Sequence, residues 1–206
     1  MSDDGAKVLR KRDFGPAGFR WLTLTRIEWA DPTGRERVWE CAERQTRSQG
    51  GVDGVAIFAL VKKAGSPISL VLVSQFRPPQ GRTVIEVPAG LIDEGESAEA
   101  AAVREPKEET GFSGVSVQET QVGANDPGMT NTNMQAVVIE VDGDAPENVN
   151  ALATPEEGEF IDVFQLPLDN LYEALQDKQK ETGWDIDARL MLHCNEVHFS
   201  THFREY

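Results

Sequence analysis

The sequence predicts an α/β fold in which a sheet lies between helices. Short segments with strand character alternate with helical ones along most of the chain. One strand segment, Ser69-Leu-Val-Leu-Val73, is almost continuously apolar, as expected of a strand that is buried on both faces. An alanine-rich segment with high helix propensity follows further on, between Ser97 and Gly111. Strands mixed with two or three helices favour layers of sheet and helix around one core.

Composition limits the class of protein. The chain has 206 residues, enough for one good core with a small appendage, and its 39% apolar and 27% charged content is ordinary for a globular protein. The formal net charge of −15 argues against binding to a nucleic-acid backbone, which needs clustered Lys and Arg. It leaves a nucleotide substrate open, because a bound metal ion supplies local positive charge.

The lack of a recognisable membrane span or signal peptide, together with the cysteine pattern, leads us to expect a cytoplasmic or nuclear protein without a membrane partner. No apolar run approaches the roughly 18 residues of a membrane span, and the first residues lack the apolar core of a signal peptide. Cys41 and Cys194 form no CxxC motif, which favours free thiols in a reducing compartment.

The first 50 residues are expected to form a region of their own. Residues 1–18 are polar and punctuated by Gly and Pro, and we expect a mobile tail there. Within residues 19–50, two strand segments (21–29 and 37–45) flank Asp31-Pro-Thr-Gly34, a type I turn signature. A hairpin alone is marginal in water, so this one must pack on the main domain, residues 51–206, or on another subunit.

The main domain is expected to contain a series of strands and then helices. The expected strands are residues 55–63, 68–76, 83–87, 115–122, 134–141 and 159–166. The expected helices, besides the alanine-rich one, are residues 169–180 and 185–198.

Three carboxylates mark the alanine-rich helix as the candidate site. Ser97 is expected to cap its start and Gly111 to end it. Glu105, Glu108 and Glu109 stand at i, i+3 and i+4 and therefore share one face, where their like charges repel. A divalent cation would remove this repulsion, and Mg²⁺ prefers carboxylates together with substrate phosphates. The alternative for these residues alone is an ordinary solvated acidic face.

Small residues on a nearby part of the same helix indicate how it packs. Ala98, Ala101 and Ala102 fall on roughly one side at 3.6 residues per turn. They would let the helix lie close to the sheet and hold the carboxylates at its edge.

The spacing of fixed residues in this segment resembles the Nudix box, G-x5-E-x7-R-E-U-x-E-E-x-G-U, in which U is apolar. The matching residues are Gly90, Glu96, Arg104, Glu105, Glu108, Glu109, Gly111 and Phe112. The resemblance implies a Nudix-type α/β/α sandwich with a mixed sheet, plus a small N-terminal antiparallel β domain. Pro106 departs from the pattern because it stands where the family has an aliphatic residue.

Flanking motifs are similar to those of the ADP-sugar (ADP-ribose) pyrophosphatase branch of this family. They are Phe76-Arg-Pro-Pro79, residues 85–93, Asp126-Pro-Gly128, Gly158-Glu-Phe160 and the N-terminal hairpin with Arg44-Gln-Thr-Arg47. In that branch the N-terminal strands build a homodimer, and each active site takes residues from both subunits. The resemblance implies hydrolysis of the pyrophosphate of ADP-ribose or a related ADP-sugar to AMP and a sugar phosphate.

Residue roles follow from the same resemblance. It implies Mg²⁺, or alternatively Mn²⁺, on Glu105, Glu108, Glu109 and the backbone carbonyl of Ala89. It places substrate contacts at Trp21, Trp39, Arg44, Arg77, Glu86 and Leu91, with Trp21 and Trp39 enclosing the adenine. Glu159 would position or deprotonate water, although Glu156 and Glu157 are alternatives, and Arg104 would hold Glu108 in place.

Two other functions compete with this interpretation. Pro106 cannot donate a backbone hydrogen bond to Ala102 and disfavours helical geometry at Glu105, so we expect a kink at residues 102–106. The chain could therefore be a nucleotide-sugar-binding module with impaired hydrolysis, or an enzyme acting on oxidised nucleoside diphosphates. A zinc site is not predicted, because His193, Cys194, His198 and His202 match no paired-ligand spacing.

Overall fold

The computed structural model describes residues 20–45, 47, 51–155 and 157–194. The predicted tail, residues 1–18, lies outside the described residues, as do Glu156, His198 and His202.

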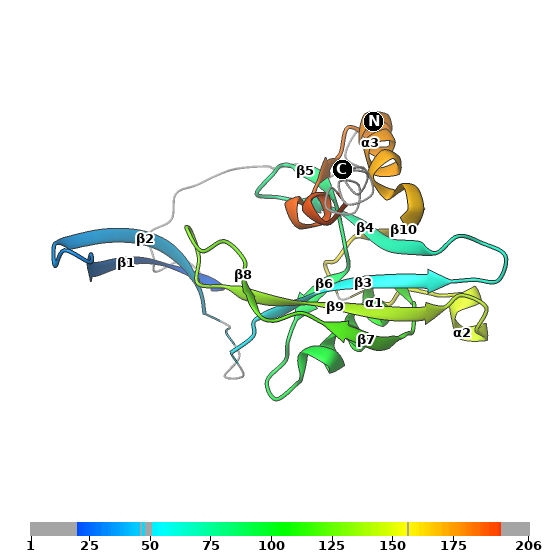
Figure 1. Cartoon of the computed structure of the whole chain (residues 1–206), viewed down its shortest axis with the longest axis horizontal. Coiled ribbons are helices and arrows are strands. Elements are labelled where there is room, and N and C mark those ends of the chain that lie inside the picture. The colour runs from blue at the N-terminus through cyan, green and yellow to red at the C-terminus, as the bar shows by residue number, and fades with distance from the viewer. Residues whose placement is uncertain (1–19, 46, 48–50, 156, 195–206) are drawn as a thin grey trace, which may run out of the picture.

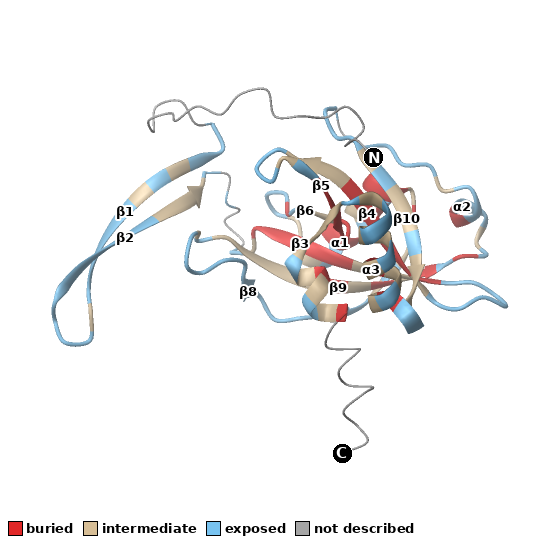
Figure 2. Ribbon diagram, turned by 90° about the horizontal axis from the view of Figure 1, so that it is seen from above, coloured by how far each residue is buried: buried red, intermediate tan, exposed pale blue. Residues whose placement is uncertain are grey.

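The N-terminal hairpin forms a sheet of its own. Strands β1 (Leu22–Ala30) and β2 (Glu36–Arg44) pair antiparallel, with Ile27 opposite Trp39. The predicted turn is confirmed: Gly34 adopts a φ of 81° and donates its N–H to the carbonyl of Asp31 at 2.8 Å. The hairpin projects from one end of the molecule (Figure 1), and its strands contain no buried residue (Figure 2).

A second sheet carries the core and has mixed pairing. Its main path runs β11-β5-β4-β3-β9-β7, while β10 pairs with β4, β6 with β3 and β8 with β9. The pairs β3–β9 and β5–β11 are parallel and the others antiparallel, which confirms the predicted mixed sheet. The strands are β3 (Gly54–Lys62), β4 (Ser69–Arg77), β5 (Arg82–Glu86), β6 (Ala89–Leu91), β7 (Val115–Glu119), β8 (Gly123–Ala124), β9 (Asn133–Asp142), β10 (Ile161–Pro167) and β11 (Asp185–Ile186).

Helices cover both faces of this sheet, so the predicted sandwich is confirmed. Because successive strand residues point to opposite faces, β4 sends Val71 to one core and Leu70 and Leu72 to the other. The first core includes α1 (Ala98–Thr110), and the second includes α3 (Leu171–Thr182) and the helical residues 188–194. A 3-10 turn (Leu168–Asn170) leads into α3, and a short α2 (Pro146–Val149) lies at the margin.

Helix α1 begins and ends where the sequence predicts. The Ser97 hydroxyl accepts a hydrogen bond from the Ala100 N–H at 3.1 Å, and Gly111 ends the helix at a φ of 78°. Ala101 and Ala102 are fully buried against the sheet. Pro106 lies buried inside this uninterrupted helix. The helix therefore tolerates the missing N–H, and a bend at residues 102–106 stays a prediction.

Some predicted boundaries are wrong. Residues 120–122 leave the strand after a bulge in β7, and the predicted strand at 159–166 begins only at Ile161. Asp185 and Ile186 pair with β5 as a strand instead of starting a helix, because parallel pairing there satisfies their backbone groups. Within the part of the chain that the structure describes, no helix is long and apolar enough to cross a membrane.

Candidate active site

A cleft of about 470 Å³ lies where β6, α1 and the start of β9 meet. It brings together eight of the predicted catalytic, substrate-binding and metal-binding residues, from segments far apart in the chain. They are Arg44, Arg77, Ala89, Leu91, Glu105, Glu108, Glu109 and Glu159. The three carboxylates of α1 therefore do line one hollow.

Gly90 allows the helix to approach β6. Strand β6 pairs with the start of β3, which places Gly90 opposite Val55. A Cβ atom at Gly90 would lie 1.9 Å from the carboxyl carbon of Glu105. Any side chain at position 90 would therefore displace the Glu105 carboxylate.

Glu109 is the most buried of the three α1 carboxylates that line the cleft. It is 5% exposed, and its Oε2 accepts a hydrogen bond from the Ala89 N–H at 3.3 Å. Burial, and then the neighbouring Glu105 charge, raise the pKa of Glu109 to about 8. Burial also raises the pKa of Glu105, although Arg104 opposes this shift.

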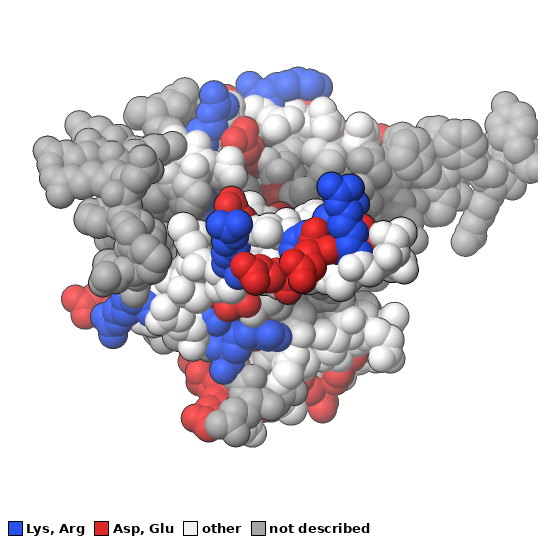
Figure 3. Space-filling model, turned by 90° about the vertical axis from the view of Figure 1, so that its left-hand side faces the viewer, with Lys and Arg blue, Asp and Glu red and all other residues white. Residues whose placement is uncertain are grey.

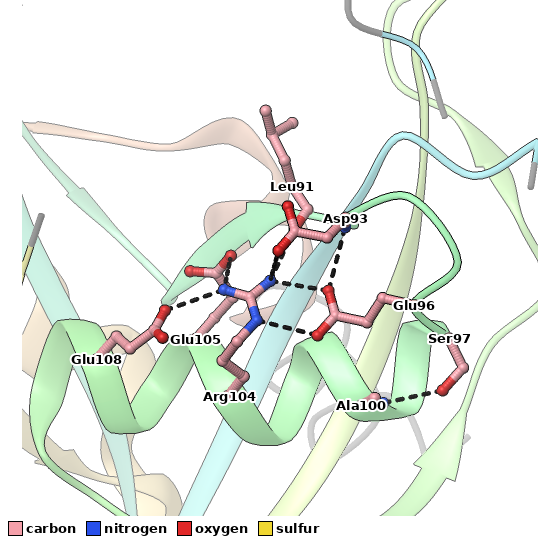
Figure 4. A network of polar contacts seen from close by, with 8 residues as sticks. All are labelled: Leu91, Asp93, Glu96, Ser97, Ala100, Arg104, Glu105 and Glu108. Atoms are coloured by element: carbon pink, nitrogen blue, oxygen red, sulfur yellow. Dashed lines mark hydrogen bonds and ion pairs between the residues drawn. The ribbon is translucent and has the colours of Figure 1, made fainter. Parts of the chain in front are cut away.

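Arg104 ties the start of the motif to the carboxylate face (Figure 4). Its Nε and Nη2 donate to the two carboxylate oxygens of Glu96 at 2.9 and 2.8 Å. Its Nη1 donates to both Glu105 and Glu108 at 2.9 Å, and Nη2 also reaches the carbonyl of Leu91. The predicted pairing with Glu108 is confirmed, and the links to Glu96 and Leu91 add a clamp between α1 and the preceding loop.

The donor set suits a hard divalent cation. Within the described ranges, no three His, Cys, Asp or Glu side chains are already gathered around one ion position, since Glu105 and Glu108 are turned to Arg104. The carboxylates are nevertheless oxygen donors, and burial together with the neighbouring Glu105 charge disfavours the charged form of Glu109, as its raised pKa reflects. A cation with oxygen ligands would favour that charged form.

Arg77 lines the cleft and forms a salt bridge with Glu86. Its Nε and Nη2 both donate to Glu86 at 2.7 Å, and the Glu86 side chain is only 5% exposed. Glu86 therefore contacts Arg77 instead of lining the cleft itself. Arg44, the last residue of β2, also lines this cleft.

The two predicted base-binding tryptophans do not line this cleft. Trp21 and Trp39 are 56% and 50% exposed on the hairpin. The Trp39 indole N–H donates to the carbonyl of Gly128 at 3.0 Å, and the Ala42 N–H donates to Met129 at 2.8 Å. The loop at residues 125–131 thus docks the hairpin on its own main domain.

Several cleft residues carry no local sequence motif and were not singled out. They are Asp53, Asn125, Thr132, Asn133, Met134 and Arg189. Asp53 and Asn133 bond each other reciprocally through backbone N–H groups and side-chain oxygens at 2.9 and 3.0 Å. Such a pair, 80 residues apart in the chain, would need correlated substitutions among relatives to be found from sequence.

The C-terminal histidine and cysteine residues contribute nothing to this cleft where they are described. His193 packs its ring against Phe58 with 4.6 Å between centroids, and Cys194 is buried in the core.

In this α/β/α sandwich, three carboxylates on one helix line a cleft together with Arg44, Arg77 and Arg189. Guanidinium groups suit phosphate oxygens, and carboxylates suit a divalent cation. The NUDIX domain family matches residues 50–191, and the chain belongs to this family.

Relatives extend the match over nearly the whole chain. An ADP-ribose pyrophosphatase of Saccharomyces cerevisiae is 45% identical over 91% of this chain and 81% of its own length. An ADP-sugar pyrophosphatase of Mus musculus is 33% identical over 91% of this chain and 88% of its own. A putative nudix hydrolase of Caenorhabditis elegans is 43% identical over 88% and 82%.

Proposed function

We propose that the protein hydrolyses the pyrophosphate of ADP-ribose or a related ADP-sugar, giving AMP and a sugar phosphate. The observation that carries the proposal is the cleft that Glu105, Glu108 and Glu109 line together with Arg77. The names of the yeast and mouse relatives supply the substrate class. Water adds to one phosphorus, the bridging P–O bond breaks, and the leaving phosphate keeps the bridging oxygen.

A divalent cation belongs to this proposal, with Mg²⁺ first and Mn²⁺ as the alternative. Glu105, Glu108, Glu109 and the Ala89 carbonyl would hold it, and it would offset phosphate charge and lower the pKa of bound water. Glu109 must lose its proton to serve as a ligand, and its raised pKa makes this loss dependent on pH.

The chain's own residues bind and orient the substrate. Arg77 is held in place by Glu86, so its remaining N–H groups are pre-oriented for phosphate oxygens. Arg44 supplies a second guanidinium and Leu91 an apolar wall. Glu159, in the loop before β10, is the proposed residue for positioning water, and Glu157 and Glu156 stay as alternatives.

Adenine stacking by Trp21 and Trp39 requires two chains. In the β1–β2 register Trp39 lies opposite Ile27, and Trp21 is six positions from Ile27 (27 − 21). At about 3.3 Å per strand residue this separates the two tryptophans by roughly 20 Å along the hairpin. One base cannot be enclosed by both, so Trp21 of one chain must meet Trp39 of another.

We therefore propose a homodimer built on the hairpin. The hairpin exposes apolar side chains along both strands, including Leu24 at 61% and Val38 at 46%. Seen from the end at which the hairpin projects, acidic and basic side chains lie next to each other (Figure 3). Apolar surface with interspersed charges of both signs suits a self-complementary interface.

The direct test is incubation of the purified protein with ADP-ribose, with and without Mg²⁺, followed by measurement of AMP. AMP formation that depends on the metal supports the proposal. Tight binding of ADP-ribose without any AMP would instead identify a nucleotide-sugar-binding module, the alternative that Pro106 raised. The uninterrupted helix and the intact carboxylate face do not favour that alternative.

Assembly is tested by removing residues 1–48 and measuring mass by light scattering at micromolar concentration. The deletion should abolish dimerisation and ADP-ribose binding together. A monomeric intact protein would contradict the dimer.

Free Cys41 and Cys194 support a reducing compartment, and we propose the cytoplasm or nucleus.

A further inference from the structure

Arg189 lies in the wall of the candidate active site and has no part in the Nudix motif. It lines the cleft together with Arg77, and both also line a second hollow next to it. The two arginines therefore form a ridge between the hollows. Arg189 is held by Asp187, as Arg77 is held by Glu86.

The short strand β11 builds this arrangement. It pairs parallel to β5, with Ile186 opposite Ile85, and the residues that follow these two are Asp187 and Glu86. The Asp187 N–H donates to the carbonyl of Ile85 at 2.9 Å, which fixes Asp187 beside the end of β5. Asp187 then caps the helix at residues 188–194, because its Oδ1 accepts from the Arg189 backbone N–H at 2.9 Å.

Asp187 also holds the Arg189 guanidinium in one orientation. Nε donates to Oδ1 and Nη2 to Oδ2, both at 2.8 Å. Nη1 lies 3.2 Å from the sulfur of Met134, a weak acceptor that also lines the cleft. A guanidinium has five N–H groups, and the paired edge uses two of them. The strong donors of Nη1 and the second N–H of Nη2 are left for a better acceptor.

The helix that carries Arg189 packs in the core on the opposite face of the sheet from α1, and Arg77 and Arg189 line the same cleft. The pKa of Arg77 is raised by its hydrogen bond to Glu86 and further by Glu109 and Asp187. The pKa of Arg189 is raised by its hydrogen bond to Asp187, with Glu86 adding to the shift and Arg77 opposing it. These directions agree with the lining of the cleft, in which both arginines stand with the carboxylates of α1.

We propose that Arg189 is a further phosphate-binding residue, which contacts the pyrophosphate of the substrate together with Arg77. This inference rests on the proposed function and adds a residue to it. Two adjacent guanidinium groups repel each other, and a shared dianionic ligand removes that repulsion. Each is backed by a carboxylate, so little side-chain entropy is lost on binding. The ligand chemistry is a phosphoryl group of a nucleoside diphosphate or its sugar ester.

The test compares ligands that differ in phosphate, bound to metal-free protein in EDTA. Calorimetry on wild type, Arg189→Ala and Arg189→Lys would use adenosine, AMP and ADP. We expect Arg189→Ala to weaken ADP binding about tenfold, the loss of roughly one charge-assisted hydrogen bond. Adenosine binding should stay unchanged, and Arg189→Lys should recover part of the ADP affinity.

Arg82→Ala is the matched control. Arg82 is an arginine in the same sheet region that pairs with Asp185 at 3.7 Å and lines neither hollow. It should bind all three ligands as wild type does. Asp187→Asn is a second variant that keeps the helix cap, since Asn caps as well as Asp, and it should weaken ADP binding in the same direction by less.

Two results would overturn the inference. One is an equal loss of adenosine and ADP affinity in Arg189→Ala, which would assign the residue to holding the helix. The other is unchanged ADP affinity. Because no turnover is measured, an ADP-specific loss in a protein that never forms AMP from ADP-ribose would uphold Arg189 and refute the proposed function. AMP formation from ADP-ribose together with unchanged ADP affinity in Arg189→Ala would support the proposed function and refute the role of Arg189.

Discussion

The hairpin strand β1 and the core strand β3 have the same length of nine residues and opposite surroundings. In β3, Val55, Ile57 and Ala59 are fully buried between two helical layers. In β1, Leu24 and Trp29 are 61% and 42% exposed. Strand-forming side chains therefore specify a strand in both places, but only β3 has its own core to stabilise it.

This difference separates chemistry from recognition. The carboxylates of the candidate site stand on α1, which packs on the core sheet, and rigid elements hold such groups most accurately. The tryptophans proposed to bind the base stand on the exposed hairpin. Variants of the α1 carboxylates should therefore change turnover or stability, and variants of the hairpin tryptophans should change binding.

The largest effect is expected from the carboxylates. Glu105→Gln and Glu109→Gln should each lower turnover roughly a thousandfold, about 4 kcal/mol in the barrier, because a charged metal ligand is lost. Turnover of ADP-ribose at saturating Mg²⁺ checks this, and circular dichroism checks that the fold is intact.

The control is Glu99→Gln, an exposed position on the same helix outside the cleft. Wild-type turnover in both carboxylate variants would remove the metal assignment and the claim that chemistry resides in the core.

The next effect is a dependence of core stability on pH in metal-free protein. Burial raises the pKa of Glu109 to about 8 in the folded chain, from an ordinary value of 4.5 that the unfolded chain retains. Its favourable contribution is fully present below pH 4.5 and is lost as pH rises to about 8, because the folded state then holds a proton that the unfolded state releases.

Urea unfolding in EDTA between pH 5 and pH 9 measures this loss, which we expect to be on the order of a few kcal/mol. The loss should be smaller in Glu109→Gln, whose amide does not titrate, and in wild type with Mg²⁺. Parallel pH profiles for wild type and Glu109→Gln would show that other groups cause the dependence.

Replacement of Pro106 should stabilise the core. Pro106→Leu restores a backbone N–H that can donate to the carbonyl of Ala102. A proline inside a helix typically lowers stability by ~3 kcal/mol. We expect a higher melting temperature and faster Mg²⁺-dependent hydrolysis. If neither changes, the helix accommodates proline without strain. If hydrolysis appears only in the variant, the natural chain is a binding module.

The smallest effects should come from the hairpin. Trp21→Ala and Trp39→Ala should each weaken substrate binding by roughly 1–3 kcal/mol, the range for one stacking partner, and raise KM more than they lower kcat. Trp29→Ala, on the same hairpin, is the control, with light scattering to verify that it keeps the oligomeric state of the wild type. Equal affinity of the wild type for a sugar nucleotide without adenine would contradict stacking as the basis of selectivity.

The sequence by itself determined the parts of this protein that depend on near neighbours. Ser97, Gly111 and the glutamates of α1 act within one helix, where spacing alone places side chains on a face, and the structure agrees. The turn at Gly34 and the buried strand β4 are equally local.

Tertiary structure decided which distant groups meet. The strand β11 has two residues and no pattern of its own, yet its pairing with β5 sets Asp187 and Arg189 beside Glu86 and Arg77. Trp39 meets Gly128, 89 residues away, through a single hydrogen bond. Periodicity reports only which face a side chain occupies. Which other face it contacts depends on the packing of the whole chain, and no local propensity encodes that.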